Sequence, residues 1–321
     1  MTLPSSGTLG LGNDNATNGI GYELSSSYGY HSQIGLACTL PERLVGQITY
    51  QAVNMGQFYG RSNALRGATL YTTSGCYTWY VPAGVSYVSV LMASTGAFAC
   101  FYCCCGNYHF SGGGGGLGYR NGYAVSQGQA LALHVPYLGY PAGNFTTTGD
   151  AWFLSWGTFR VNAASRCGGG YVGPLVSGGT GGAGRRGLYF RGAGGGGAGG
   201  YSGNGGNGGQ SGFNYGSGTG YGLPGSGGAA GGGGQSTITN AGGGGGVGIY
   251  GQGGSGGASV SGGLAGSTGA GCGGSSGYGG TYGGGAGIGS SNALRCPGGG
   301  MVRIVYPGNS RQFPSCDVGL Y

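Results

Sequence analysis

The residues best suited to chemistry are cysteines gathered near position 100. Cys100 and Cys103 have the Cys-x-x-Cys spacing of metal and redox sites, and Cys104, Cys105 and His109 follow closely. A structural zinc site needs four convergent ligands, and no second Cys-x-x-Cys pair supplies the other half. Three interpretations stay open: a metal site, disulfides, or free thiols buried among the neighbouring aromatic residues. We expect free thiols, with no bound metal and no cofactor.

Carboxylates and histidines are too few and too scattered to predict hydrolysis. The five acids are Asp14, Glu23, Glu42, Asp150 and Asp317. A glycan hydrolase needs two carboxylates about 5 to 10 Å apart, and only Asp150 falls in the part of the chain with a β pattern. The histidines, at positions 31, 109 and 134, have no regular spacing to a serine or an acid. We therefore predict that the chain is not an enzyme.

The basic residues exclude phosphate binding through a Walker loop and favour an anionic partner. The chain has 12 basic residues, all of them arginine, and a net charge of +7, although only 5% of residues are charged. Because a Walker loop requires lysine, phosphate binding by that route is excluded. The arginines are scattered except for Arg185, Arg186 and Arg191, so we expect no nucleic-acid partner. The sign of the charge suits an anionic cell envelope or glycan.

The elements that would position these residues are short β-strands. Residues 67–161 alternate apolar, β-branched and aromatic residues between turn signals, which is typical of strands. The expected strands are Tyr77–Val81, Val85–Met92, Tyr119–Ala124, Ala130–Val135, Trp152–Val161 and, far downstream, Met301–Tyr306. The second of these is apolar on both faces and is predicted to be buried. The last is predicted to pair back into the same sheet, because a short apolar strand needs neighbours.

Residues 1–66 differ from the rest of the chain. They are polar and rich in turn signals, and their leucines recur without a sustained helical period. We expect loops and short turns that wrap a partner or an assembly. The N-terminus shows neither the basic start nor the apolar run of a signal peptide, and no stretch of about 20 apolar residues predicts a membrane span.

The region from Gly168 to Gly300 dominates the sequence, with 63 glycines among 133 residues. A disordered linker is one interpretation, because glycine loses the most backbone entropy on folding. Collagen is excluded, since glycine does not recur strictly at every third residue. The alternative that we favour is a bundle of polyglycine II helices, extended and left-handed with three residues per turn. Such helices lack internal hydrogen bonds and would satisfy their backbone groups in their neighbours.

Large apolar residues punctuate this region, and a disordered chain has no use for them. Tyrosine, present 25 times, suits contacts to sugars and proteins alike because its ring is amphipathic. We therefore predict receptor contacts among aromatic residues and arginines of the glycine-rich loops, although each aromatic residue could instead pack the bundle. The candidates are Tyr201, Phe213, Tyr215, Tyr221, Tyr250, Tyr278, Tyr282, Arg185, Arg186 and Arg191.

Several motifs resemble a glycine-rich domain found in structural proteins of tailed bacteriophages. Residues 73–85, with the sequence Thr-Ser-Gly-Cys-Tyr-Thr-Trp-Tyr-Val-Pro-Ala-Gly-Val, resemble the opening of that domain. Residues 112–121 and 298–308 are similar to its middle and closing segments, and Arg-Gln-Phe-Pro-Ser at 311–315 is similar to its ending. Residues 3–7 and 58–62 are similar to a short module that precedes such domains. The cysteine-rich residues 98–105 depart from the family pattern, which continues with glycines there.

The resemblance implies a virion component of a tail fibre, tail tip or baseplate, made in the host cytoplasm, where cysteines stay reduced. It implies attachment to a host surface glycan or protein, other tail or baseplate proteins as partners, and a homo-oligomer, with a trimer expected from the symmetry of most fibres. An architectural protein of the baseplate, neck or capsid surface is the alternative. Contacts for assembly are expected in the leader at Leu3, Pro4, Phe58, Tyr59 and Arg61.

Together these observations predict a mainly β protein, a β-sandwich that carries a polyglycine II helix bundle. The expected divisions are an assembly leader at 1–66, a sandwich formed by 67–165 plus 298–321, and the glycine-rich insertion at 166–297.

Overall fold

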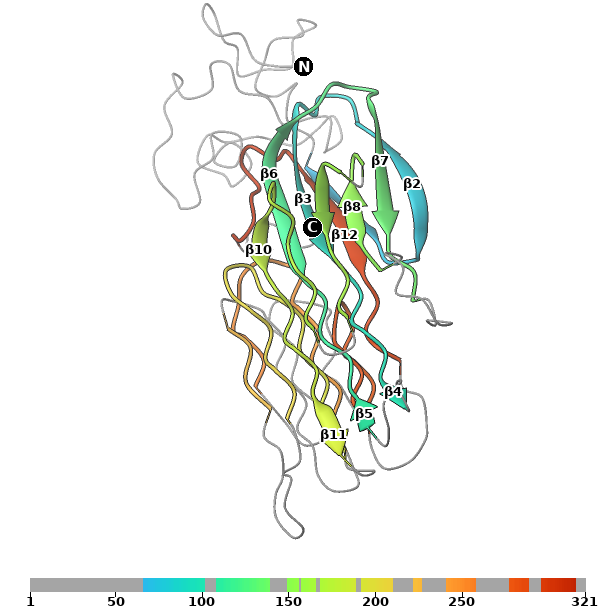
Figure 1. Ribbon diagram of the computed structural model, residues 1–321. Coiled ribbons are helices and arrows are strands. Elements are labelled where there is room, and N and C mark those ends of the chain that lie inside the picture. The colour runs from blue at the N-terminus through green and yellow to red at the C-terminus, as the bar shows by residue number, and fades with distance from the viewer. Residues whose placement is uncertain are drawn as a thin grey trace, which may run out of the picture. The chain divides into compact units, whose positions relative to one another are not determined.

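The chain divides into two units, Met1–Leu65 and Arg66–Tyr321. The computed structural model describes residues of the second unit: 66–101, 108–138, 149–155, 157–165, 168–188, 192–209, 222–226, 241–257, 277–288 and 296–315. These residues are mainly β, and none of them is helical (Figure 1). No helix in this described part could therefore cross a membrane.

Two antiparallel sheets form the body of the unit. The larger has the order β1-β12-β3-β6-β10, formed by Gly67–Tyr71, Met301–Tyr306, Tyr87–Ala93, Leu117–Ala124 and Ser177–Gly179. The smaller has the order β2-β7-β8-β9, formed by Gly75–Tyr80, Ala130–Val135, Ala151–Phe153 and Phe159–Val161. A third, short ladder joins β11 (Arg186–Leu188), β5 (Tyr108–Phe110) and β4 (Cys100–Phe101) away from both sheets (Figure 1).

The predicted return of the last strand is confirmed. β12 pairs with both β1 and β3, and Gly67 lies opposite Tyr306 in the register. Arg311 strengthens this closure, because its Nη1 donates to the carbonyl oxygens of Gly67 at 2.8 Å and Tyr306 at 3.0 Å. The glycine-rich residues between β10 and β12 are thus inserted between two strands of one sheet.

The prediction of one strand over Trp152–Val161 is wrong. The chain forms a hairpin there, with β8 and β9 paired antiparallel. The N–H of Thr158 donates to the carbonyl of Ser155 at 3.1 Å, and their hydroxyl oxygens lie 2.7 Å apart. Because the two hydroxyl residues bond to each other, they favour a tight turn in the middle of the apolar run.

The larger sheet is covered on both faces. Between the sheets, inward side chains of both form one apolar cluster that includes Trp79, Leu133, Phe153, Val90 and Ile304. The opposite face packs against apolar residues of the glycine-rich region, in a second cluster formed by Leu91, Ala93, Leu117, Met301, Val305, Ala198, Tyr201, Val247, Ile249, Tyr282 and Phe313. Burial on both faces confirms the prediction for β3 and explains its continuous apolar run.

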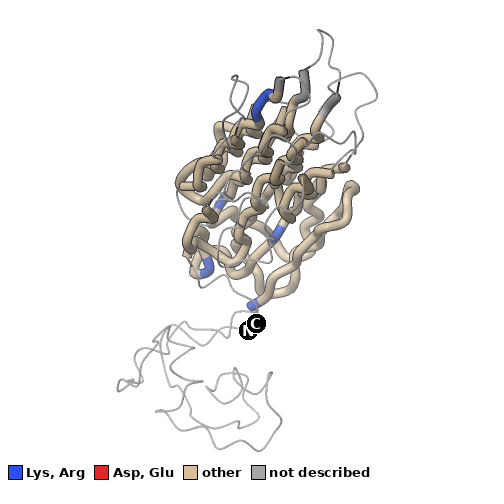
Figure 2. The backbone as a smooth tube through the Cα atoms, turned by 90° about the horizontal axis from the view of Figure 1, so that it is seen from below, with Lys and Arg blue, Asp and Glu red and all other residues tan. Residues whose placement is uncertain are grey.

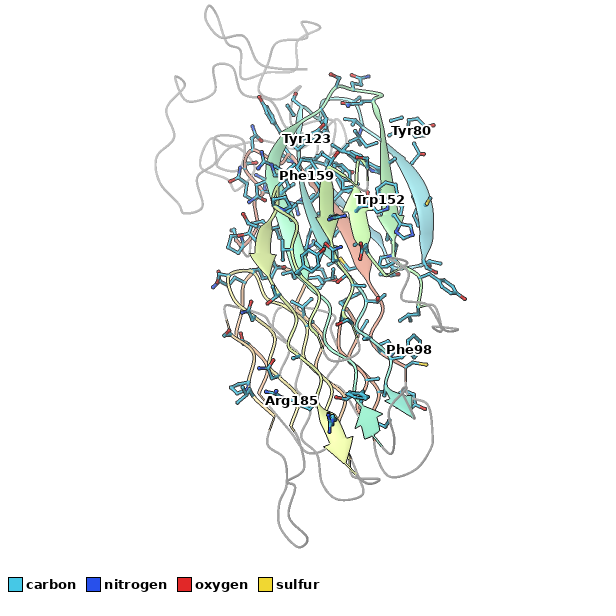
Figure 3. All side chains as sticks on the ribbon, in the orientation of Figure 1. Tyr80, Phe98, Tyr123, Trp152, Phe159 and Arg185 are labelled. Carbon is cyan, nitrogen blue, oxygen red and sulfur yellow. The ribbon has the colours of Figure 1, made fainter. Side chains whose placement is uncertain are left out.

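Four strands of the larger sheet continue directly into segments that lie among the glycine-rich residues. Residues 94–99 follow β3, 111–116 precede β6, 180–185 follow β10 and 296–300 precede β12. Seen from below, the described glycine-rich segments lie side by side (Figure 2). Side chains crowd the sheets and become sparse in this region (Figure 3). Backbone contacts must therefore hold it together.

Residues 194–200 show how those backbone contacts are arranged. Every third N–H group donates to the same neighbouring segment, and three segments are used in turn. The first set is Gly194, Gly197 and Gly200, which donate to Gly209, Gly206 and Gly203 at 2.9, 2.8 and 2.9 Å. The second is Gly195 and Ala198, which donate to Gly242 and Gly245 at 3.0 and 2.9 Å; the third is Gly196 and Gly199, which donate to Gly112 and Gly115 at 3.0 and 2.9 Å.

Such close approach leaves no room for side chains. A Cβ atom on Gly112 would lie 1.7 Å from the carbonyl oxygen of Ala97, and one on Gly114 would lie 1.9 Å from that of Gly197. The obstructing atoms are backbone and cannot rotate away. Glycine is therefore required at these two positions for a steric reason.

Candidate functional site

In the part of the glycine-rich region that the structure describes, two adjacent basic residues lie beside β11, at the end away from the two sheets (Figure 1). Arg185 and Arg186 are both exposed, and Arg186 begins β11 (Figures 1 and 3). The pairing of β11 with β5 places Arg186 opposite Phe110. An arginine remains charged at any physiological pH, so this end presents fixed positive charge.

Ser111 holds Arg185 in place. The backbone N–H of Arg185 donates to Ser111 Oγ at 2.6 Å, and the N–H of Ser111 donates to the carbonyl of Arg185 at 2.9 Å. Ser111 Oγ in turn donates to the carbonyl of Gly194 at 2.6 Å. The Nε of Arg185 donates to the carbonyl of Gly208 at 3.2 Å. The arginine therefore projects from a backbone anchored to two glycine-rich segments.

Two asparagines fasten the neighbouring edge with the same three-residue spacing. Asn204 Oδ1 accepts bonds from the backbone N–H and hydroxyl of Thr180 at 3.1 and 2.7 Å, and Asn207 Oδ1 accepts from the N–H of Ala183 at 2.7 Å. These bonds satisfy backbone donors that face away from other glycine-rich segments. The surface that leads to Arg185 is consequently well ordered by hydrogen bonds.

Two of the predicted receptor residues are instead packed inside. Tyr201 is 1% exposed; its ring stacks on Phe313 at 6.0 Å, and its hydroxyl oxygen accepts from the N–H of Gly251 at 3.2 Å. Tyr282 is 7% exposed and lies in the same apolar cluster. Both side chains lie between the larger sheet and the glycine-rich region, so in this fold they are packing residues that a receptor does not reach.

The other predicted tyrosines differ in exposure. Tyr278 is 43% exposed, whereas Tyr250 is half-buried beneath the guanidinium of Arg303. The remaining receptor candidates, Phe213, Tyr215, Tyr221 and Arg191, lie outside the described residues, as do the leader candidates Leu3, Pro4, Phe58, Tyr59 and Arg61. Of the predicted receptor residues that the structure describes, Arg185, Arg186 and Tyr278 are exposed, and the two arginines are neighbours in the chain.

Asp150 is the one acid among the described residues, and it is buried. Its Oδ1 accepts from the N–H of Ala163 at 2.7 Å, and its Oδ2 accepts from Nδ2 of Asn162 at 2.9 Å. These bonds fasten the segments before β8 and after β9 to each other. In the part of the chain that the structure describes, no three histidine, cysteine or acidic residues gather as a metal site. The cysteines at positions 103–105 lie outside that part, and the described thiols of Cys76 and Cys296 are free and exposed.

Sequence reasoning missed the two buried arginines. Arg303 is 1% exposed and Arg311 is 2% exposed, and both bond to backbone carbonyls. Burial lowers the pKa of Arg303, because desolvation penalises its charged form. The interruption of the apolar run Met-Val-Arg-Ile-Val-Tyr by an arginine was the available signal.

No protein-family model matches this chain, and no curated protein matches it.

Proposed function

We propose that the chain is a structural protein of a tailed-phage virion, a tail-fibre or tail-tip adhesin that binds the host cell surface non-covalently. In this proposal the two facing sheets are a β-sandwich, and the glycine-rich region is a bundle of polyglycine II helices. The observation that carries the proposal is the three-residue hydrogen-bond repeat of residues 194–200. Three residues per turn with three neighbours is the arrangement expected of packed polyglycine II helices.

Such a bundle suits a stiff extension. Many of its backbone groups bond between segments that are far apart in sequence, and at many of its glycines, such as Gly112 and Gly114, a Cβ atom would collide with backbone atoms. It holds Arg185 and Arg186 at the end away from the place where the chain enters and leaves the sheet. Positive charge at that end suits an anionic envelope or glycan, and other tail or baseplate proteins would bind elsewhere on a homo-oligomer, which we take to be a trimer.

One observation favours the alternative, a baseplate, neck or capsid decoration protein with a purely architectural role. Tyr201 and Tyr282, predicted to meet a receptor, pack the interior instead. An architectural protein needs no exposed recognition residues.

Imaging of intact virions tests the proposal. A small tag beside Gln252 is suitable, because this residue is exposed and its N–H bonds to the carbonyl of Pro314 at 2.6 Å, near the sheet. The tag therefore leaves the end with Arg185 and Arg186 unobstructed. We expect label at the tips of tail fibres or at the tail tip. Label around the neck, capsid or an inner baseplate ring would eliminate the adhesin and favour the architectural role.

Virions with Arg185→Gln and Arg186→Gln provide the second test. Removal of both charges is expected to slow adsorption to host cells, most strongly at low ionic strength, because the attraction is screened by salt. Arg66→Gln is the control, since Arg66 is exposed at the start of the described unit. Equal adsorption by all virions would contradict a role for this pair.

A further inference from the structure

The outward face of the smaller sheet carries a second group of residues suited to recognition. The register places Cys76 opposite His134, His134 opposite Trp152, and Trp152 opposite Arg160. One row of four side chains therefore crosses β2, β7, β8 and β9 from edge to edge. With strands about 4.8 Å apart, the three steps span about 14 Å.

The row projects away from the apolar core. Along β7, Leu131, Leu133 and Val135 are buried and His134 is only partly buried; along β8 and β9, Trp152 and Arg160 are partly exposed between buried neighbours. The rings of His134 and Trp152 are nearly parallel, at 19°, with centroids 5.6 Å apart. Cross-strand stacking fixes both rings in position.

The residues beside this row are small, except at one end. Thr78 and Ala132 form the next pair along β2 and β7, and both are exposed. Tyr80, opposite Ala130, follows on the same face and is 66% exposed (Figure 3). An extended ligand can thus approach the backbone between the ring of Tyr80 and those of His134 and Trp152.

The polar atoms of the row have defined roles. His134 Nδ1 lies 2.9 Å from the backbone carbonyl of Asp150. Because a carbonyl only accepts, this hydrogen bond requires a proton on Nδ1, and in the neutral tautomer that carries it Nε2 is an acceptor. A guanidinium carries five N–H donors in one plane, so that of Arg160 can pair with a carboxylate alongside its other partners. The row therefore combines an acceptor for a hydroxyl, an apolar ring and a cation.

The charges of the described residues favour an anionic ligand. The described residues include exposed arginines, whereas their one carboxylate, Asp150, is buried and accepts hydrogen bonds from Asn162 and Ala163. An anionic partner meets no exposed carboxylate on this described surface. Sugars in turn favour aromatic rings that present both an apolar body and polar groups.

We propose that this face, formed by Tyr80, His134, Trp152 and Arg160, binds an acidic saccharide whose carboxylate pairs with Arg160 and whose ring lies against Trp152. The inference rests on the proposed attachment to a host surface and names the class of glycan. It adds a glycan contact on the smaller sheet, separate from the end that carries Arg185 and Arg186.

Calorimetric titration of the full chain with defined oligosaccharides tests the inference. The probes are oligomers of galacturonate and of glucuronate, each compared with its neutral methyl ester. We expect the acids to bind and the esters to bind at least about tenfold more weakly, since a charge-assisted pair is lost. Trp152→Ala and Arg160→Gln should each raise the Kd for the acid by about tenfold or more, while Trp152→Phe keeps part of the affinity.

Arg66→Gln is the matched control, because it removes the same charge at an exposed position outside both candidate surfaces. Urea unfolding of every variant checks that the fold is retained. Loss of binding in Arg186→Gln but not in Arg160→Gln would overturn the inference and leave the proposed function standing. Equal binding of the acids and their methyl esters would overturn the assignment of an acidic saccharide as the ligand. If none of the acids binds, the inference fails, whereas the virion imaging decides the proposed function independently.

Discussion

The guanidinium carbon of Arg303 lies 4.7 Å from the centre of the Tyr250 ring, and Nη1 of Arg303 donates a 2.7 Å hydrogen bond to the carbonyl of Ile249. Arg303 belongs to β12, whereas its two partners belong to the glycine-rich region. A single side chain thus joins the sheet to the segment that crosses its face, through a buried bond and a cation–π contact.

Replacement of this arginine should destabilise the unit. In Arg303→Met the carbonyl of Ile249 loses a buried donor, and we expect a loss of about 1 to 3 kcal/mol in the free energy of unfolding. Urea denaturation measures it. Arg66→Met, at an exposed position, should change the value by no more than about 0.5 kcal/mol. Equal stability of the two variants would show that Arg303 does not join the layers.

A methyl group at Gly112 should disrupt the glycine-rich region. The new Cβ would lie 1.7 Å from the carbonyl oxygen of Ala97, so the backbones must separate. Gly112→Ala is expected to cost on the order of 3 kcal/mol or more. Gly157→Ala is the control, because nothing lies within 4 Å of its Cβ position, and the expected change is below about 1 kcal/mol. Thermal unfolding of both variants measures whether the methyl group at position 112 destabilises the fold more than the methyl group at position 157 does.

Tyr201 should contribute to stability through its ring and its hydroxyl. Tyr201→Phe removes the acceptor for Gly251 and should cost about 1 kcal/mol. Tyr201→Ala leaves a cavity beside Phe313 and should cost about 3 to 5 kcal/mol. Tyr278→Ala, at a 43% exposed position, should cost less than about 1 kcal/mol. Unchanged unfolding of Tyr201→Ala would contradict a packing role.

Alkaline pH should destabilise the fold through Tyr119. Burial raises the pKa of the Tyr119 phenol above its ordinary value near 10, so the folded state holds this proton more tightly than the unfolded state does. Below pH 10 both states keep the proton; as the pH rises above 10, only the unfolded state releases it, and stability falls. Tyr119→Phe should make this decline shallower. Chemical denaturation at pH 8 to 11 provides the comparison, and parallel curves for the two proteins would refute the effect.

Local pattern predicted the strands whose side chains alternate or stay apolar throughout. Ala130–Val135 was located correctly because its leucines and its outward alanines follow a period of two. β1 was missed because Gly67–Tyr71 is short and its pairing partner lies far downstream. The turn after β8 was missed because the apolar residues on both sides of Ser155 and Thr158 form what looks like one continuous strand pattern.

The residues of the candidate site could likewise be predicted only in part from the local sequence pattern. Arg185 and Arg186 stand out in the sequence as adjacent charges in a region nearly without them, and both are exposed. Tyr201 resembles an exposed loop residue because glycines surround it, yet those glycines allow close packing that buries its ring. Cross-strand register, which no local pattern gives, aligns His134, Trp152 and Arg160.

The pairing of β1 with β12 also determines how the unit resists a pulling force. Gly67 lies opposite Tyr306, and Tyr71 lies opposite Val302, so β1 runs toward the glycine-rich region from which β12 emerges. A force that pulls residue 66 in the direction away from the glycine-rich region acts along the axis of β1. The ladder of hydrogen bonds to β12 is then loaded in shear, with many bonds strained at once, and Arg311 adds a clamp at the loaded end. This geometry suits a part that must stay attached while one end is held and the other is pulled.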